Sequence, residues 1–353
     1  MAEKKSIAII GTSPLSLLKG WLMVSKNQNL SITYFDVHDR IGGAWYNESS
    51  PKGHEIECGC HIWSHAPKVY AFIEKELGVP LRVFNPAPRF VHRKIHLPYS
   101  LKKTIDSYKF FSKSLLKGKL SAGKQVKMRP EFSFQLLGKK NKYPALGSPE
   151  LTNALVRKLK DFSSVEFKVG EKITGLEIND GVLVKTDKSS YQFDEVQLTS
   201  VSDIDEIKGG GEPIHLEKNR MDYIHFLLEN DQPFKRKVNY WRLMKDSIIH
   251  RLADISYQTN GEENLMLVGI KQDGYYSHSE EELVNYVSNA LKQMKIIDDK
   301  QALSKRKTHI FPTYYIKPEL RAKINNYAPQ QLQLFHTTDI MYGMHYLLEE
   351  FGY

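Results

Sequence analysis

The stretch Ser6-Ile7-Ala8-Ile9-Ile10-Gly11-Thr12-Ser13-Pro14-Leu15-Ser16 decides the fold of this chain. Its apolar first half is typical of a buried parallel strand, and this pattern stops at Gly11. Leucines at a helical spacing follow, and Ser31 to Phe35 has the composition of a second strand that closes on Asp36. The order strand, turn, helix, strand predicts a βαβ unit.

In such a unit, turn glycines let backbone N–H groups approach a pyrophosphate, and the acid after the second strand binds ribose hydroxyls. Asp36 is placed for the second task. Of the pattern G-x-G-x-x-G only Gly11 remains, because serines stand at the other two glycine positions. We expect Ser13 to cap the helix, with Pro14 in its first turn and Leu15 beside the cofactor. The lost glycines leave open a Rossmann unit that no longer holds a nucleotide.

The composition is that of a folded globular protein with room for two to three lobes, since 41% of its 353 residues are hydrophobic and 26% are charged. Cys58 and Cys60 cannot form a disulfide framework, so we expect reduced thiols, a cytoplasmic setting and no metal site. The apolar stretch near the N-terminus is too short for a signal peptide, and we expect no membrane span.

Positive charge is concentrated in one stretch. The chain has 50 lysines and arginines against 41 acids, and the segment from Lys102 to Lys142 holds twelve basic residues and two acids. Such a segment either attracts an anionic partner, such as a nucleotide sugar, an anionic glycan or a membrane surface, or forms a solvated helical face. Nucleic acid is not an expected partner, because no zinc-finger or RNA-binding signature is present. The sequence does not specify an oligomeric state.

The order of elements predicts an α/β fold with a discontinuous Rossmann-like domain, whose last strand and helix lie at Leu332 to Tyr346. Near the middle of the chain, Ser148 is expected to cap a helix that runs to about Leu159. A basic helical lobe and a smaller α+β substrate domain are inserted. The predicted boundaries are 1–98, 144–205 and 308–353 for the Rossmann-like domain, 99–143 for the lobe and 206–307 for the substrate domain.

Six short segments, in the right order, resemble motifs of UDP-galactopyranose mutases, whose fold is shared with flavin amine oxidases and protoporphyrinogen oxidases. They span nearly the whole chain. The matching segments are Ile41-Gly42-Gly43-Ala44-Trp45 for I-G-G-N, Gly59-Cys60-His61-Ile62-Trp63 for G-P-H-I-F, Leu97-Pro98-Tyr99-Ser100-Leu101 for L-P-F-N-L, Val238-Asn239-Tyr240 with His250-Arg251-Leu252 for V-N-Y and T-R-I-I-E, Phe311-Pro312-Thr313-Tyr314-Tyr315 for I-P-Y-Y, and Thr337-Thr338-Asp339 for Y-x-D.

The resemblance implies an FAD cofactor, with the paired-glycine turn lying against it and the histidine of G-x-H-I beside the flavin ring. Beyond the first turn, the cofactor-binding residues that it implies are Asp36, Gly42, Gly43, Ala44, Trp45, His61, Ile62, Thr338 and Asp339. The catalytic residues that it implies are His61, Arg251, Tyr314, Tyr315 and Asp339.

Each of these catalytic assignments has a structural alternative. Arg251 suits a substrate diphosphate, but it would also suit an ion pair with Asp254. Tyr314 and Tyr315 alternate sides on a strand, so one can meet a phosphate or sugar while the other packs in the core. Asp339 could simply cap the last helix. A histidine beside apolar neighbours, such as His61, is often a core residue.

Three functions stay open. In the first, the protein resembles a mutase of polysaccharide biosynthesis and acts on a nucleotide sugar or related anionic sugar through reduced flavin. In the second, oxidised flavin removes a hydride, as in the amine oxidases. In the third, the fold is a binding or scaffolding subunit without flavin turnover. The third is favoured by two departures at the cofactor phosphates, the lost glycines and Gln330-Gln331 in place of the family's Gly-Arg.

Overall fold

The computed structural model describes most of the chain. The described residues are 4–59, 63, 65–83, 89–92, 95–98, 141–199, 204–209, 211–216, 219–236, 238, 241–243, 247–301, 303–335 and 340–353. Among them, no helix is both long and apolar enough to cross a bilayer.

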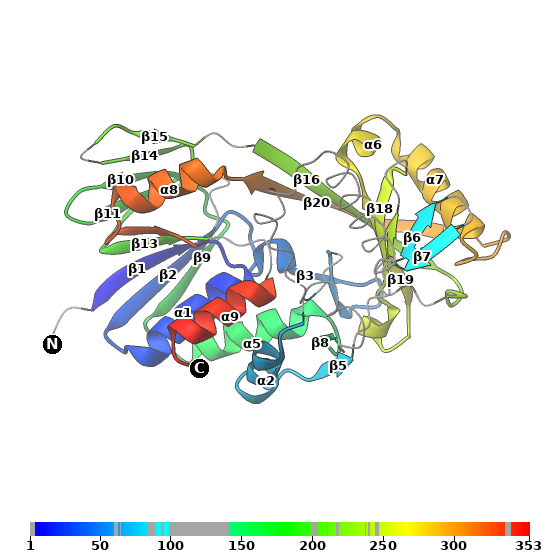
Figure 1. Ribbon diagram of the computed structural model, residues 1–353, viewed down its shortest axis with the longest axis horizontal. Helices are drawn as coiled ribbons and strands as arrows, with labels where there is room; N and C mark the ends of the chain where they lie inside the picture. The colour runs from blue at the N-terminus through cyan, green and yellow to red at the C-terminus, as the bar shows by residue number, and fades with distance from the viewer. Residues whose placement is uncertain are drawn as a thin grey trace, which may run out of the picture.

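A five-stranded parallel sheet lies at the centre of the Rossmann-like domain, with the order β21-β13-β1-β2-β9 (Figure 1). Each neighbouring pair is parallel. Segments from both ends of the chain meet in it, which confirms the predicted α/β class with a Rossmann-like sheet. The strands are β1 (Lys5–Ile10), β2 (Leu30–Asp36), β9 (Val165–Val169), β13 (Glu195–Leu198) and β21 (Leu332–Leu334).

Helices α1 (Pro14–Lys26), α5 (Ser148–Lys160) and α9 (Ile340–Glu350) cover one face of this sheet, with α2 (Pro67–Lys75) beside α9 (Figure 1). The apolar side chains of α1, including Leu17, Leu18 and Leu22, are fully buried in the core. Gly20 lets α1 approach β2 closely, because a Cβ there would lie 1.8 Å from the Tyr34 hydroxyl oxygen.

A smaller sheet and α8 (Pro318–Tyr327) cover the opposite face. Its strand order is β12-β11-β10-β14-β15, and its apolar side chains share a core with Ala8, Ile10 and Phe35 of the parallel sheet. Both faces of β1 and β2 are therefore covered, which explains their continuous apolar sequences. The strands are β10 (Ile173–Ile178), β11 (Val182–Thr186), β12 (Ser190–Phe193), β14 (Glu206–Lys208) and β15 (Ile214–His215).

A seven-stranded sheet forms the second part of the protein, with the order β20-β16-β19-β18-β17-β6-β7. Side chains of Ile224, Phe226 and Leu228 pack with α7 (Glu280–Gln293), whereas the intervening Leu227 joins the core of the Rossmann-like domain. The strands are β6 (Arg89–His92), β7 (Ile95–Pro98), β16 (Asn219–Asn230), β17 (Trp241–Leu243), β18 (Ile249–Asp254), β19 (Asn264–Ile270) and β20 (Leu303–Tyr315), and α6 (Gln272–Tyr276) follows β19.

Strands β6, β7 and β20 all pair within this second sheet. The domain boundaries expected from the sequence stay a prediction. There are also two small antiparallel pairs, β3 (Asn47–Ser49) with β4 (Glu55–Glu57) and β5 (Leu81–Val83) with β8 (Lys142–Pro144).

The buried carboxylate of Glu57 ties the β3–β4 pair to the start of α5. Its Oε2 accepts hydrogen bonds from the Tyr143 hydroxyl at 2.6 Å and from the Ser148 backbone N–H at 3.1 Å. The helix begins one residue earlier than the expected cap implies, because Gly147 is the N-cap and Ser148 is the first helical residue. Gly147 has a φ of +100°, and a Cβ there would lie 2.6 Å from the Gln258 side chain. The Ser148 cap was therefore a wrong prediction.

Glu57 generates a prediction about pH. Burial raises the pKa of this carboxyl group, although hydrogen bonds from Tyr143 and Ser148 oppose the rise. A raised carboxyl pKa stabilises the fold below the pKa of the unfolded chain, and this stabilisation is lost as pH rises through the folded pKa. We therefore expect the free energy of unfolding of the wild type, minus that of Glu57→Gln, to fall as pH rises above about 4.3.

Urea unfolding of both proteins across this pH range measures the difference. Glu55→Gln is the matched control, because Glu55 lies on the same strand with an exposed side chain. If the difference in free energy of unfolding between the wild type and Glu57→Gln stays constant with pH, Glu57 does not titrate with a raised pKa.

Candidate functional site

The turn after β1 has the predicted capped form. Gly11 has a φ of +102°, and Pro14 is the first residue of α1. The Ser13 hydroxyl caps the helix by accepting from the Ser16 backbone N–H at 3.4 Å, which confirms the predicted cap. Ser16 Oγ lies 2.8 Å from Ser13 Oγ and 2.6 Å from Thr199 Oγ1. The serines that replace the two glycines therefore form a chain of hydroxyl contacts across the turn.

The Asp36 carboxylate holds this turn in place. It is buried at the end of β2, and its Oδ2 accepts hydrogen bonds from the Thr12 backbone N–H at 3.0 Å and from the Thr12 hydroxyl. Its Oδ1 accepts from the His38 backbone N–H at 3.0 Å. Thr12 Oγ1 in turn accepts from the Gly42 backbone N–H at 3.0 Å. One carboxylate thus links the first turn to the paired-glycine loop, and its role toward a ribose stays a prediction.

The paired glycines make the tight turn that the sequence predicts. Gly42 has a φ of +127°, and a Cβ there would lie 2.8 Å from Tyr46 Cα. Gly43 has a φ of +56° and faces the first turn, since its Cβ would lie 3.6 Å from Ser13 N. Ala44 and Trp45 complete the short helix η1 (Gly43–Trp45). A side chain at Gly42 would clash with the backbone of Tyr46, and one at Gly43 would be strained by the positive φ.

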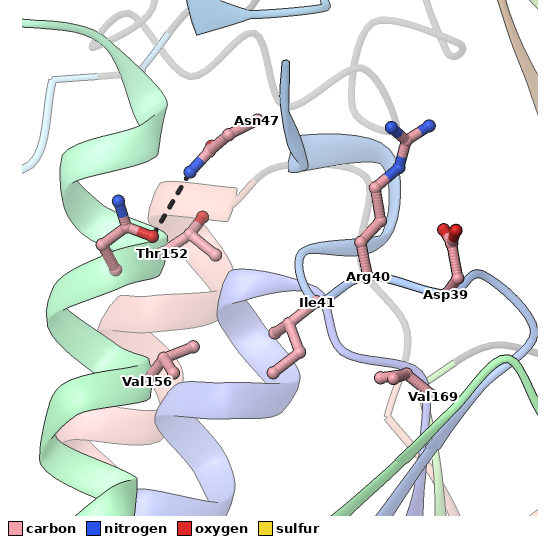
Figure 2. A pocket seen from close by; sticks show the side chains of 8 residues that line it. Asp39, Arg40, Ile41, Asn47, Thr152, Val156 and Val169 are labelled. Carbon is pink, nitrogen blue, oxygen red and sulfur yellow. Dashed lines mark hydrogen bonds between the residues drawn. The ribbon is translucent and has the colours of Figure 1, made fainter. Parts of the chain in front are cut away.

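A cavity of about 380 Å³ lies beside this loop, between α5 and the carboxyl ends of β2 and β9 (Figure 2). Ligands of open α/β sheets bind at this edge. Its apolar lining comes from Ile41, Val156 and Val169, which lie around the space on three different elements (Figure 2). Its polar lining comes from Asp39, Arg40, Asn47, Thr152 and Asn153.

Three buried polar atoms of this lining have no hydrogen-bond partner among the described residues: Arg40 Nε, Asn47 Oδ1 and Thr152 Oγ1. Thr152 is 2% exposed. The Asn47 amide nitrogen does have a partner, because it donates to Asn153 Oδ1 at 3.3 Å (Figure 2). Buried polar groups are normally satisfied, so the lack of a partner at these three atoms is unusual.

Arg40 links the cavity to a second group of side chains. Its guanidinium lies 3.4 Å from the centre of the Tyr46 ring, and Nη1 donates to Glu48 Oε1 at 2.6 Å. Lys307 donates to the other oxygen of Glu48 at 2.6 Å. Burial alone would raise the pKa of Glu48, but Lys307 and Arg40 outweigh it and lower that pKa. The carboxylate therefore stays ionised between two cations.

Arg251 lies on β18, with its guanidinium carbon 5.5 Å from the centre of the Tyr223 ring. A Cβ at Gly269 would lie 2.4 Å from His250 Nε2 and 2.6 Å from Arg251 Cγ, so this glycine leaves room for both side chains. The His225 ring is stacked with His250 at 6.3 Å between ring centres. Arg251 thus joins an aromatic and basic row on the seven-stranded sheet.

Sequence reasoning missed two buried members of this region, His225 and His309. They are paired in register on β16 and β20, and both are nearly inaccessible to solvent. The Tyr46 hydroxyl lies 3.0 Å from His309 Nδ1. The only available signal was the occurrence of single histidines within apolar strands, which does not show which strands pair.

Several predicted site residues cannot be placed. His61, Ile62, Thr338 and Asp339 lie outside the described residues, as do residues 102–140 of the basic stretch. Tyr314 and Tyr315 are described only as backbone of β20, where they pair with Arg220 and Asn219. The roles expected for these residues stay predictions.

Comparisons with known proteins agree on the fold. Residues 9–75 match the family of NAD(P)-binding Rossmann-like domains. No curated protein sequence matches the chain. Among similar solved structures is reduced UDP-galactopyranose mutase, with a TM-score of 0.69 and 12% identity over 99% of this chain and 94% of that one.

Two further structures cover 99% of this chain and 98% of their own. They are a fatty acid isomerase from P. acnes that produces CLA, with a TM-score of 0.66 and 10% identity, and putrescine oxidase, with a TM-score of 0.65 and 11% identity. The resemblance drawn from the six sequence segments is therefore confirmed at the level of the fold. At sequence identities of 10–12%, similarity to these structures shows a shared fold and no more.

The described residues fit an adenine dinucleotide at its adenosine end, where the cavity has apolar walls and unpartnered polar atoms. At the pyrophosphate the fit is altered. The Ser13 hydroxyl lies at the first turn of α1, where a phosphate oxygen accepts N–H groups in the G-x-G-x-x-G turn. A hydroxyl can also donate to phosphate, so Ser13 would contact the pyrophosphate through its side chain.

The Asp36 network generates a prediction. Asp36→Ala leaves the buried Thr12 donors and the part-buried His38 backbone N–H without their acceptor, so we expect the free energy of unfolding to fall by about 1–3 kcal/mol without added nucleotide. Asp39→Ala, in the exposed part of the same loop, is the matched control and should change stability little. Urea unfolding measures both. Equal stability of the two variants would show that Asp36 does not hold the turn.

Proposed function

We propose that this chain binds FAD along the carboxyl edge of β1 and β2 and acts through it on a nucleotide sugar or a related anionic sugar. The observation that carries the proposal is the cavity at the ends of β2 and β9, with its three unpartnered polar atoms. The shared fold with UDP-galactopyranose mutase supports the choice of substrate class.

The cavity suits the adenosine end of the cofactor. Its volume of about 380 Å³ lies within the roughly 300–1,000 Å³ usual for ligand sites. Ile41, Val156 and Val169 offer apolar surfaces to a flat base. Thr152 Oγ1 and Asn47 Oδ1 would exchange hydrogen bonds with the base or its ribose.

The substrate would bind against the seven-stranded sheet, away from the adenosine end of the cofactor. Arg251 presents a planar, permanently charged group that suits a diphosphate, and Gly269 leaves room for it. The histidines of the same row add donors for sugar hydroxyls. When bound, FAD would supply the electrons or the nucleophile for the reaction, while these side chains orient the substrate.

A second candidate function is a binding or scaffolding subunit without flavin. Two observations favour it: the Ser13 hydroxyl already caps α1, and both oxygens of the Asp36 carboxylate accept hydrogen bonds from the chain itself. In a flavoprotein these groups would normally face the cofactor. Amine-oxidase-like hydride removal remains a variant of the first candidate, since putrescine oxidase shares the fold.

The visible absorption spectrum of the freshly purified protein, followed by release and identification of any cofactor, separates the two candidates. We expect a flavin spectrum with about one FAD per chain. A colourless protein that also fails to take up added FAD would favour the scaffold. For the cavity, Thr152→Val should weaken FAD binding about five- to tenfold, because one buried hydrogen bond is worth about 1 kcal/mol.

Thr174→Val is the matched control for this variant, because Thr174 is an exposed threonine on β10, away from the cavity. FAD affinity is measured by the change in flavin fluorescence on titration. If Thr152→Val binds FAD as tightly as Thr174→Val does, the adenosine does not lie in this cavity.

The substrate assignment has its own test. Arg251→Ala should weaken UDP binding at least tenfold, because it removes a charge-assisted contact worth about 1.5–3 kcal/mol, while flavin content stays unchanged. Calorimetric titration with UDP measures the affinity. Arg306→Ala, which removes an arginine paired with Glu229 elsewhere on the sheet, is the matched control. Unchanged UDP affinity in Arg251→Ala would remove Arg251 from the site.

A further inference from the structure

We propose that Glu48, Cys58 and His309 form a binding site for a single Zn²⁺ ion. They come from β3, from the end of the β3–β4 pair and from β20, and one donor atom of each lies within 4.8 Å of the other two. Carboxylate, thiolate and imidazole are the ligands that Zn²⁺ takes in proteins. The site is separate from the cavity lined by α5, although Arg40 contacts both.

His309 is held in the manner of a metal-binding imidazole. The residue is 2% exposed, and the Tyr46 hydroxyl lies 3.0 Å from its Nδ1. Its Nε2 is buried and has no hydrogen-bond partner in the described part of the chain. Metal-bound histidines usually engage their second ring nitrogen in such a hydrogen bond, which fixes the ring. A buried Nε2 without a partner is unusual and calls for an explanation.

Zn²⁺ binds cysteine as the thiolate and histidine as the neutral imidazole, so occupation of the site requires the Cys58 thiol to lose its proton. Binding of Zn²⁺ would then form the Zn–S bond and release the thiol proton to solvent.

Glu48 supplies the second negative charge. Its two oxygens already accept from Arg40 and Lys307, but each carboxylate oxygen has two lone-pair sites and can bind a metal as well. The two cations weaken the attraction of the site for a cation, whereas the carboxylate and the new thiolate together balance the charge of Zn²⁺. A sulfur and a nitrogen donor favour Zn²⁺ over Mg²⁺ or Ca²⁺.

Three protein ligands leave the fourth tetrahedral position open, as in zinc sites that bind water or another small ligand. The alternative is a purely structural cluster. Tyr46, His309 and Phe311 pack together, and Lys307 bonds to Glu48, so these contacts join β20 to the β3–β4 pair without any metal. The two alternatives predict different behaviour toward Co²⁺, which takes the place of Zn²⁺ and reports a thiolate ligand by its colour.

The experiment titrates Co²⁺ into the full chain after removal of metals with a chelator, and records difference spectra. We expect a thiolate-to-Co²⁺ charge-transfer band that saturates at one equivalent and disappears on addition of Zn²⁺. Cys58→Ser should abolish the band, whereas Cys60→Ser, the matched control at the chain's other cysteine, should retain it. No band at one equivalent, or a band lost in Cys60→Ser alone, would overturn the proposal.

A second variant tests the site independently, in case Cys58→Ser fails to fold. Tyr46→Phe keeps the packing of the ring but removes the hydroxyl that holds His309, so we expect its Kd for Zn²⁺ to rise roughly 10- to 100-fold. Competition with a chromophoric chelator measures this Kd. Unchanged affinity would overturn the role of the Tyr46 hydroxyl in positioning the ligands. Neither readout depends on flavin, so failure of the zinc site and failure of FAD binding are distinguishable.

Discussion

The hydrogen bonds to the buried carboxylate of Asp36 are the interaction on which the loops at the carboxyl edge of the parallel sheet depend. This carboxylate accepts hydrogen bonds from Thr12 and from His38. The Thr12 hydroxyl oxygen in turn accepts a hydrogen bond from the Gly42 backbone N–H. The turn after β1 and the loop after β2 therefore have one fixed relative position. Because that loop forms one wall of the cavity at the ends of β2 and β9, the shape of the cavity follows from this carboxylate.

The loop after β2 serves two regions at once. Arg40 and Ile41 line the cavity, while Tyr46 and Glu48 contact His309 and Lys307 on β20. Arg40 joins the two regions, because its guanidinium stacks on Tyr46 and bonds to Glu48. A ligand in the cavity that draws Arg40 away would change the charge balance around Glu48. The cavity and the group formed by Glu48, Cys58 and His309 are thus electrostatically connected through Arg40.

The long strands β16 and β20 divide their side chains between two cores. Ile224, Phe226 and Leu228 pack under α7, whereas Leu227 packs into the Rossmann-like domain and His225 lies beside Phe311. Alternation along a strand follows from backbone geometry alone. Strand pairing, including the irregular register at Ile249 to Arg251, determines that the histidines and Arg251 lie in the same aromatic row. Gly269 then provides the space that these larger side chains need.

Local features were readable in the sequence because they depend on neighbours in the chain. The apolar runs, the Ser13 cap and the tight turn at Gly42 and Gly43 follow from periodicity and from the steric freedom of glycine, and they determined the α/β class. The cap of α5 was not readable, because Gly147 is required by the Gln258 side chain, which is distant in sequence.

Only the tertiary structure determines which residues form each site. Thr152 and Ile41 both line the cavity because α5 packs beside the loop after β2. Glu48, Cys58 and His309 lie together because side chains of β20 contact the β3–β4 pair. No spacing in the sequence marks these groups. Their members are brought together by the stacking of separate sheets and helices, which depends on the summed packing of many side chains rather than on any short motif.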